Sequence, residues 1–213
     1  MNCDKRQMLL YAVTDRAWTG RQSLYEQVEC ALKGGATCVQ LREKQLDEAQ
    51  FLKEAREIGA LCRRFDVPFL INDNVDLALA CDADGVHVGQ DDMACAQARQ
   101  KLGPKKIIGV SAHSVQEALS AVRDGADYLG SGAVFVTSTK TNVRPLPHET
   151  LREICHSVSI PVVAIGGITR ENLPQLAGTG VSGVALVSAI FAAPDIELEC
   201  RALRALSEQV VRA

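Results

Sequence analysis

Polar residues alternate with apolar ones at the end of a short run at residues 38–44, which reads CVQLREK. In an extended strand successive side chains point to opposite faces, so Gln40, Arg42 and Lys44 share one face, and the other face carries Val39, Leu41 and Glu43. An amide and two cations on one face favour a phosphate-rich ligand. The alternative for this strand is a layer of ion pairs that fills the interior of the fold.

Carboxylates follow the next two apolar runs. Asn72 and Asp73 end one run, and Asp91 and Asp92 come shortly after another. Mg²⁺ in proteins is often held by one or two carboxylates, which leave positions for substrate phosphates. Asp73 with either Asp91 or Asp92 could form such a site. The alternative for both pairs is N-capping of the helices that follow.

The long segment at residues 133–147 carries hydroxyl groups and a lysine at Thr137, Thr139 and Lys140. Loops of this length are uncommon in compact domains and often bind ligands. Hydroxyls and an ammonium group are natural phosphate ligands, so this segment is a candidate phosphate-binding loop. A solvated surface loop is the alternative.

Small residues near the C-terminus suggest a second anion site. The pair Gly166-Gly167 follows an apolar run, and Ser188 follows the next one at Val187. Glycine lets backbone N–H groups approach phosphate oxygens closely.

Ser111, His87 and His113 are further candidates for contact with a ligand. Ser111 ends an apolar run and could donate a hydrogen bond to a ligand. The two histidines could transfer protons. A histidine inside a strand, such as His87, is more typical of a packing residue.

These candidates follow strands that alternate with amphipathic stretches along the chain. Such alternation indicates parallel strands, and eight units in 213 residues fit a small (β/α)₈ TIM barrel, an α/β fold, as a single domain over residues 1–213. A doubly wound sheet is the alternative. The expected strands are residues 9–14, 38–42, 68–72, 85–88, 107–111, 128–131, 162–165 and 184–187. The expected helices include residues 22–33, 47–65, 115–123, 148–156 and 196–210.

Composition narrows the functional class. Hydrophobic residues make up 47% and charged residues 23%, the usual globular mix, and the net charge is -3, which disfavours a mainly electrostatic nucleic-acid binder. No apolar run is long enough to span a membrane, and the first residues do not resemble a signal peptide. The eight cysteines form no C-x-x-C pair. We therefore expect a cytoplasmic protein that binds neither nucleic acid nor membrane, and the sequence leaves a homo-oligomer open.

In a TIM barrel the candidate residues meet at one rim, because sites form at the C-terminal ends of the strands. The rim would then hold two anionic subsites. One would bind a metal and a diphosphate, and the other a monophosphate. An enzyme that joins two phosphorylated molecules, with pyrophosphate as the leaving group, fits this layout.

Seven segments in order along nearly the whole chain resemble the thiamine-phosphate synthase family. They are residues 10–15 (LYAVTD), 40–44 (QLREK), 72–73 (ND), 85–92 (GVHVGQDD), 109–111 (GVS), 137–140 (TSTK) and 166–168 (GGI). The resemblance implies a TIM barrel and condensation of hydroxymethylpyrimidine diphosphate with hydroxyethylthiazole phosphate. The products would be thiamine phosphate and pyrophosphate, and Mg²⁺ would be required. A thiazole tautomerase-like isomerase and a non-catalytic barrel that binds phosphorylated metabolites are the alternatives.

The resemblance also implies roles for individual residues. Pyrimidine diphosphate would contact Gln40, Arg42, Lys44, Asn72, Ser111 and Lys140. Mg²⁺ would bind Asp73 and Asp92. Thiazole phosphate would contact Thr137, Thr139, Gly167, Val187 and Ser188. Arg42, Lys44, Ser111 and Lys140 would be the catalytic residues. The chain departs from the family pattern at Ala133, Val136 and Pro147, which puts in question how the 133–147 loop behaves.

Overall fold

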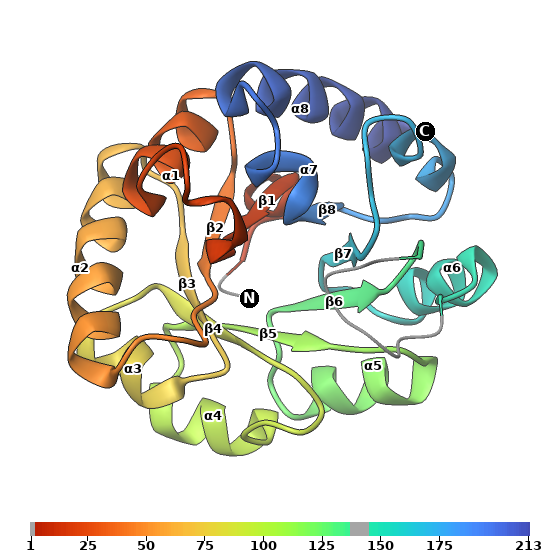
Figure 1. The fold of residues 1–213 in the computed structure, drawn as a ribbon. Helices are drawn as coiled ribbons and strands as arrows, with labels where there is room; N and C mark the ends of the chain where they lie inside the picture. The colour runs from red at the N-terminus through yellow and green to blue at the C-terminus, as the bar shows by residue number, and fades with distance from the viewer. Residues whose placement is uncertain (1–2, 137–144) are drawn as a thin grey trace.

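Eight short parallel strands pair side by side and close into a barrel in the order β1 to β8. The structure is a computed structural model that describes residues 3–136 and 145–213. Figure 1 looks along the barrel and shows the helices as an outer ring around the strands. The expected (β/α)₈ TIM barrel is confirmed. The strands are β1 (Leu10–Val13), β2 (Cys38–Leu41), β3 (Phe69–Asn72), β4 (Gly85–Val88), β5 (Ile107–Ser111), β6 (Tyr128–Gly132), β7 (Val162–Ile165) and β8 (Gly183–Leu186).

Helices follow most strands, and those expected from the sequence agree with the structure within two residues at each end. The helices are α1 (Leu24–Lys33), α2 (Glu48–Arg64), α3 (Val75–Ala80), α4 (Cys95–Leu102), α5 (Val115–Arg123), α6 (His148–Ser157), α7 (Ser188–Phe191) and α8 (Ile196–Arg212). Short 3₁₀ helices are η1 (Lys5–Met8), η2 (Arg16–Trp18) and η3 (Leu173–Leu176). No membrane-spanning helix occurs among the described residues, since none is both long and apolar enough.

The expectation of a helix after every strand is wrong at β7, which is followed only by the 3₁₀ helix η3. Pro174 lies in the first turn of η3, and Gly178 has a φ of +74° shortly after its end. Proline cannot donate a helical hydrogen bond, and glycine readily takes the left-handed conformation that ends a helix. The segment between them is therefore too short for an α-helix.

Alternation along the strands divides the apolar residues into two cores. Leu10 and Ala12 of β1 belong to the large core between barrel and helices, whereas Tyr11 and Val13 belong to a smaller cluster inside the barrel. Tyr11 lies opposite Cys38 of β2 and opposite Ala185 of β8, and this pairing closes the barrel. The inward-facing positions of each strand therefore continue, past its C-terminal end, to the polar residues at the rim.

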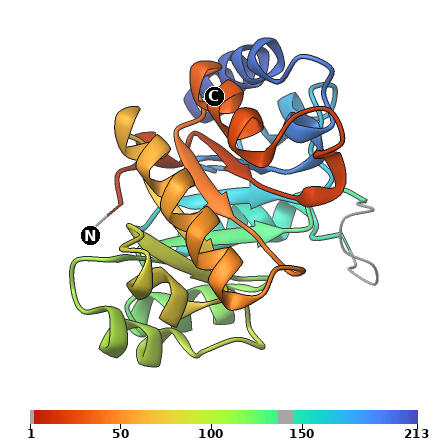
Figure 2. The ribbon, with the colours of Figure 1, turned by 60° about the vertical axis from the view of Figure 1, so that its left-hand side comes forward.

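The N-terminal segment lies where the strands begin. Cys3 and Met8 pack into the interior cluster, and Figure 2 shows the N-terminus at one end of the barrel. The N-terminal segment fills that end of the interior. The opposite end, where the strands terminate, is the place to look for a site.

Candidate active site

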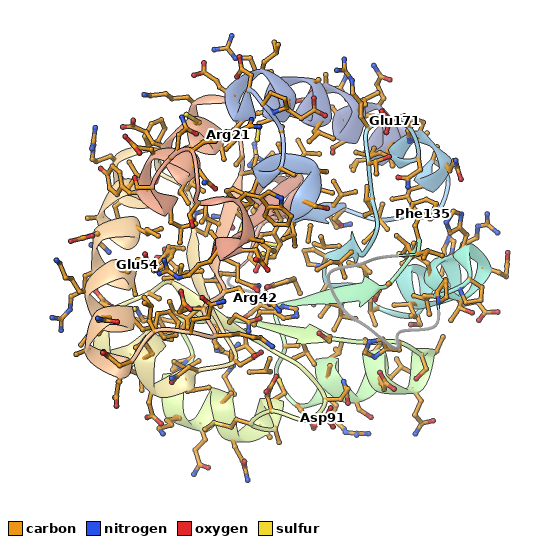
Figure 3. All side chains as sticks on the ribbon, in the orientation of Figure 1. Arg21, Arg42, Glu54, Asp91, Phe135 and Glu171 are labelled. Atoms are coloured by element: carbon orange, nitrogen blue, oxygen red, sulfur yellow. The ribbon has the colours of Figure 1, made fainter. Side chains whose placement is uncertain are left out.

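The strand ends bring most of the predicted polar residues to one rim. Arg42 and Lys44 follow β2, Asn72 ends β3 and Ser111 ends β5. In Figure 3 Arg42 lies toward the middle of the ring of helices, while Asp91 lies at its edge. Gln40 is buried at 4% exposure inside β2, as the alternation predicted. Because neighbouring parallel strands end at the same level, these groups surround one opening.

Two residues of the first strand end hold Arg42. The Arg42 backbone N–H donates to Thr14 Oγ1 at 3.0 Å, and Arg42 Nη1 donates to Asp15 Oδ2 at 2.8 Å. Asp15 is the second residue after the end of β1, so the strand-end rule that selected the other candidates applies to it as well. Asp15 was not among the site residues predicted from the sequence. The Asp15 carboxylate fixes one edge of the guanidinium and leaves its other donors for a ligand.

The Glu43 carboxylate organises the loop that carries these cations. Its Oε1 accepts from the backbone N–H groups of Lys44 at 2.7 Å and Gln45 at 2.6 Å, and its Oε2 accepts from Arg16. Burial acts to raise the pKa of Glu43, but the backbone donors and Arg16 together lower it below its usual value. A charged Glu43 thus points away from the opening and holds the loop in place, as the alternation predicted for this position.

Asp73 and Asp92 come together at the rim, and neither caps a helix. The N-cap of α3 is Asn74, whose side chain accepts from the Leu77 N–H at 2.9 Å. The N-cap of α4 is Ala94, which makes no side-chain cap. Helix capping, the alternative explanation for these acids, is therefore wrong for both.

Several features of Asp73 are typical of a functional residue. Burial and contact with the Asp92 carboxyl group raise the pKa of Asp73 to about 6, while nearby Asn72 and Lys44 act in the opposite direction. Its φ is +62°, and its backbone N–H donates to His87 O at 2.8 Å. Residues held in this conformation cluster at active and ligand sites. A carboxylate pair that repels itself in this way is suited to share a cation.

The donor set at the rim fits magnesium. Asp92 Oδ2 accepts from the Gly89 N–H at 2.7 Å, which orients the carboxylate, and Asn72 Nδ2 donates to Asp73 Oδ2 at 2.5 Å. Among the described residues no group of three or more His, Cys, Asp or Glu side chains could hold a metal. Two carboxylates are enough for Mg²⁺, which commonly keeps water and substrate phosphate as its other ligands.

A chain of hydrogen bonds crosses the barrel below the rim. It runs from Gln40 through Tyr11, Tyr128 and His87 to Ser111. His87 was predicted either to transfer protons or to be a packing residue, and neither tyrosine was predicted to belong to the site. The other candidate proton-transfer residue, His113, is exposed and pairs with Glu117 on α5 at 3.1 Å.

The second predicted subsite is described only in part. Gly167 has a φ of +64°, and a Cβ atom there would lie 2.3 Å from Val136 O, so only glycine fits. Val187 immediately precedes α7, which begins with the exposed Ser188. Predicted ligands Thr137, Thr139 and Lys140 lie outside the described residues.

The ends of the 133–147 loop are described. Leu146 N–H donates to Ala133 O at 2.6 Å, which brings the two ends of the loop together. Pro147 forms the N-cap position of α6 with a φ of -59°, and Val136 is 84% exposed.

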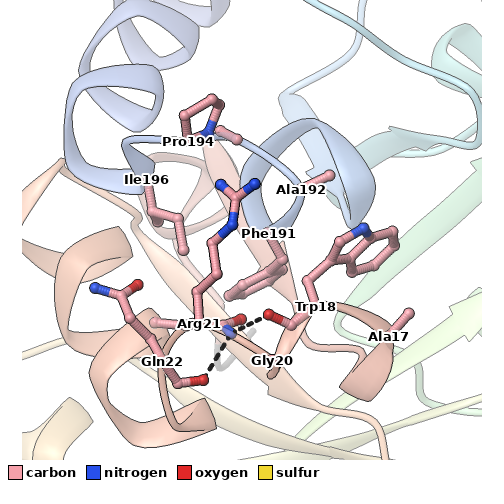
Figure 4. A pocket seen from close by; sticks show the side chains of 11 residues that line it. Ala17, Trp18, Gly20, Arg21, Gln22, Phe191, Ala192, Pro194 and Ile196 are labelled. Atoms are coloured by element: carbon pink, nitrogen blue, oxygen red, sulfur yellow. Dashed lines mark hydrogen bonds between the residues drawn. The ribbon is translucent and has the colours of Figure 1, made fainter.

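A cavity of about 390 Å³ lies beside the rim, between the segment after β1 and the segment from α7 to α8. Figure 4 shows Trp18, Arg21 and Phe191 around it. The buried side chain of Gln27 donates to the Trp18 carbonyl at 2.8 Å and to the Gln22 carbonyl at 3.1 Å. None of the predicted site residues lines this cavity.

Comparison with known proteins assigns the chain to a family. Residues 10–190 match the family described as thiamine monophosphate synthase. The chain belongs to this family. A thiamine-phosphate synthase from Chloroflexus aurantiacus is 52% identical over 198 residues, which cover 92% of this chain and 91% of that relative. One from Clostridium acetobutylicum is 47% identical over 194 residues, which cover 91% of this chain and 92% of that relative.

A solved structure agrees with this membership of the thiamine monophosphate synthase family. Thiamine phosphate pyrophosphorylase from Pyrococcus furiosus superposes with a TM-score of 0.90 at 41% sequence identity, covering 97% of this chain and 98% of that one. The likeness therefore extends over nearly the whole barrel.

Proposed function

We propose that this chain condenses hydroxymethylpyrimidine diphosphate with hydroxyethylthiazole phosphate to give thiamine phosphate and pyrophosphate. Besides membership of the family, the observation that carries the proposal is the meeting of Asp73 and Asp92 beside Lys44 at the rim. Carboxylates next to cations are suited to a magnesium-bound diphosphate.

The pyrimidine diphosphate would lie over β2, β3 and β5. Gln40, Asn72 and Ser111 would contact this substrate. Arg42, Lys44 and Lys140 would bind its diphosphate oxygens, and Asp73 and Asp92 would hold Mg²⁺. Support comes from the Arg42–Asp15 bond, which fixes the guanidinium at the opening, and from the effect of Lys44 on the pKa of Asp73.

The thiazole phosphate would lie on the other side of the opening, where β6, β7 and β8 end. Its phosphate would contact Thr137, Thr139, Gly167, Val187 and Ser188. Support comes from the positive φ of Gly167, which turns the backbone sharply after β7. Backbone N–H groups in such a turn can approach phosphate oxygens without interference from a side chain.

The reaction breaks the bond between the pyrimidine methylene carbon and the diphosphate oxygen, and then forms a bond from that carbon to the thiazole nitrogen. Bound Mg²⁺ would neutralise charge on the leaving pyrophosphate. Arg42, Lys44 and Lys140 would stabilise the same charge as it develops. The two binding subsites would hold the thiazole nitrogen in line with the carbon. No protein nucleophile takes part, and burial raises the pKa of several of the cysteine thiols, including Cys3 and Cys200, to about 12.

Pyrophosphate release tests this proposal. The purified chain should release pyrophosphate only when both substrates and Mg²⁺ are present, and thiamine phosphate should appear in equal amount. A thiazole tautomerase would instead convert its thiazole carboxylate phosphate without the pyrimidine. A non-catalytic barrel would bind the substrates and release nothing. Either of these two results would refute the proposal.

The proposal extends to the setting of the enzyme. Its partners would be the two small substrates, with no nucleic acid and no membrane, and the chain would act as a single domain over residues 1–213 in the cytoplasm. All eight cysteines are free, as expected in a reducing compartment. Size measurement in solution would decide whether it forms a homo-oligomer.

A further inference from the structure

The hydrogen-bonded chain inside the barrel joins two proposed substrate ligands that lie on different strands. Gln40 Nε2 donates to the Tyr11 hydroxyl at 2.6 Å, and the two tyrosine hydroxyls lie 2.9 Å apart. The Tyr128 hydroxyl lies 2.8 Å from His87 Nδ1, and His87 Nε2 lies 3.0 Å from Ser111 Oγ. One end of this chain is thus an amide on β2, and the other end is a hydroxyl on β5.

The barrel is shaped around the middle of this chain. A Cβ atom at Gly109 would lie 2.0 Å from Tyr128 Cζ, and one at Gly130 would lie 2.9 Å from His87 Cε1. The ring centroids of Tyr11 and Tyr128 are 5.9 Å apart in an edge-to-face arrangement. Tyr11 is 2% exposed and Tyr128 is fully buried. Glycines on the inner faces of β5 and β6 therefore leave the space that the Tyr128 and His87 rings occupy.

Each phenol carries one hydrogen, so all the hydrogen bonds of the network run in one direction, and the Gln40 amide group sets which direction that is. Burial raises the pKa of both Tyr11 and Tyr128 well above the usual value, so both hydroxyls keep their hydrogen. With the Gln40 amide nitrogen donating to it, Tyr11 donates to Tyr128, which in turn donates to His87 Nδ1. A buried hydroxyl without an acceptor is costly, so each later bond follows the direction that the Gln40 amide nitrogen sets.

The consequence appears at the two ends. His87 then carries its hydrogen on Nε2 and donates it to Ser111 Oγ, so the Ser111 hydroxyl hydrogen remains available for a ligand. At the other end the Gln40 amide oxygen remains available, and among the described residues it has no hydrogen-bond partner. The Gln40 end of the hydrogen-bonded series is thus an acceptor, and the Ser111 end is a donor.

The opposite direction would exchange these two roles. If Gln40 turned its amide over, its oxygen would accept from Tyr11, and every later bond would reverse as far as Ser111. Gln40 would then present a donor and Ser111 an acceptor. The two directions cannot be mixed without leaving a buried hydroxyl unpaired, so the two ends change together.

We propose that Tyr11, Tyr128 and His87 are positioning residues that make Gln40 an acceptor and Ser111 a donor, and that they thereby select a pyrimidine with an amino group. This inference rests on the proposed function. The pyrimidine of thiamine carries a ring amino group, which can donate to the Gln40 oxygen. A ring with a carbonyl group in that place would face the Gln40 oxygen with a second acceptor, which the site disfavours.

Tyr128→Phe tests the proposal, because it removes the hydroxyl group in the middle of the hydrogen-bonded series from Gln40 to Ser111. Without the Tyr128 hydroxyl, the buried Tyr11 hydroxyl has lost its acceptor and regains one only if Gln40 turns its oxygen toward it. Gln40 would then present its amide nitrogen to the substrate. The variant should therefore discriminate less well between the amino pyrimidine diphosphate and the analogue with a carbonyl group in its place.

The measurement is kcat/KM for both pyrimidine diphosphates at saturating thiazole phosphate and Mg²⁺. The preference of the parent for the amino substrate should fall by roughly tenfold in Tyr128→Phe, the effect of one neutral hydrogen bond. The different intrinsic reactivity of the two rings cancels when the preferences of parent and variant are compared. A purely structural effect of the substitution would lower both rates together and leave the preference unchanged.

The third tyrosine of the chain provides a matched control. Tyr25 lies on α1, and its hydroxyl accepts from Arg64 Nη1 at 3.3 Å. Tyr25→Phe should keep the preference of the parent. An unchanged preference in Tyr128→Phe, or the same loss in Tyr25→Phe, would overturn the inference while the proposed function stood. A parent that turned over neither pyrimidine would refute the proposed function itself, and the inference with it.

Discussion

Replacing Asp73 with asparagine should stabilise the metal-free protein while it abolishes magnesium-dependent turnover. Asparagine has nearly the same shape as aspartate and tolerates the φ of +62° at this position. The substitution therefore removes the charge and keeps the backbone conformation. The stabilisation is expected because the Asp73 carboxylate is partly buried against the carboxyl group of Asp92.

The magnitude follows from the pKa of Asp73, which rises from 3.8 to about 6 on folding. At ~1.4 kcal/mol per pKa unit this corresponds to ~3 kcal/mol. The carboxyl group is only partly buried, so solvent screening reduces the expected gain to ~1 kcal/mol. For a chain of this length, that gain raises the melting temperature by ~2–4 °C.

The gain should depend on pH in a defined direction. Because the pKa of Asp73 is higher in the folded state, the folded parent takes up a proton as the pH falls from about 6 toward 4 and becomes more stable relative to the unfolded chain. Above about pH 6 the full cost of the charge remains. The advantage of Asp73→Asn should thus be largest near neutral pH and should vanish near pH 4.

Thermal unfolding with a chelator, at neutral pH and near pH 4, measures this stability. Titration with Mg²⁺ and the turnover assay measure binding and function, where we expect a loss of at least ~100-fold in kcat. Asp91→Asn is the matched control, since Asp91 is exposed and lies at the edge of the ring in Figure 3. The reasoning fails if Asp73→Asn leaves the neutral melting temperature unchanged or lowers it, or if Mg²⁺ stabilises parent and variant equally.

Three other substitutions separate leaving-group stabilisation from folding. Arg42→Lys should lower kcat/KM by ~10–100-fold with little change in melting temperature, because an ammonium group cannot replace a guanidinium that binds Asp15 and, in the proposed site, phosphate oxygens. Unchanged kinetics would exclude Arg42 from the diphosphate site. Asp127→Asn should lower the free energy of unfolding by ~3 kcal/mol in urea titration and leave KM unaltered, because the buried Asp127 carboxylate pairs with Arg99 at 2.5 Å; a loss well below ~1 kcal/mol would contradict this. Lys140→Ala should slow the bond-breaking step, and a parent-like single-turnover rate would argue against that role.

Local patterns predicted the inward-facing residues of β2 correctly. Val39 and Leu41 pack in the outer core, while Gln40 is buried inside the barrel and Arg42 and Lys44 follow toward the rim. This prediction succeeds because the faces of a strand alternate with a period of two, which depends only on the local backbone. The positive φ at Gly35 and Gly125, where helices turn into strands, follows from local chemistry in the same way.

Other choices could not be made from local sequence. Asn72, Asp73 and Asp92 all stand where a helix cap would also fit, and only the contact between the two carboxyl groups, together with Asn74 as the actual cap, decides against capping. The sequence predicted a helix after every strand, and this prediction was applied to the segment after β7 as well. Pro174 limits the helix there, and only the 3₁₀ helix η3 forms.

The order of the strands, the closed barrel that this order favours and the residue types at the strand ends can all be predicted from the amino-acid sequence. Which of these residues contact one another depends on the folded barrel. Tyr11 and Tyr128 are 117 residues apart, and Arg42 and Asp15 are 27 apart, yet each pair forms a hydrogen bond. Such contacts depend on how the barrel closes and on the space left by inward-facing glycines. Local sequence periodicity cannot predict the closure of the barrel or the space beside the glycines, because both arise from the packing of all eight strands together.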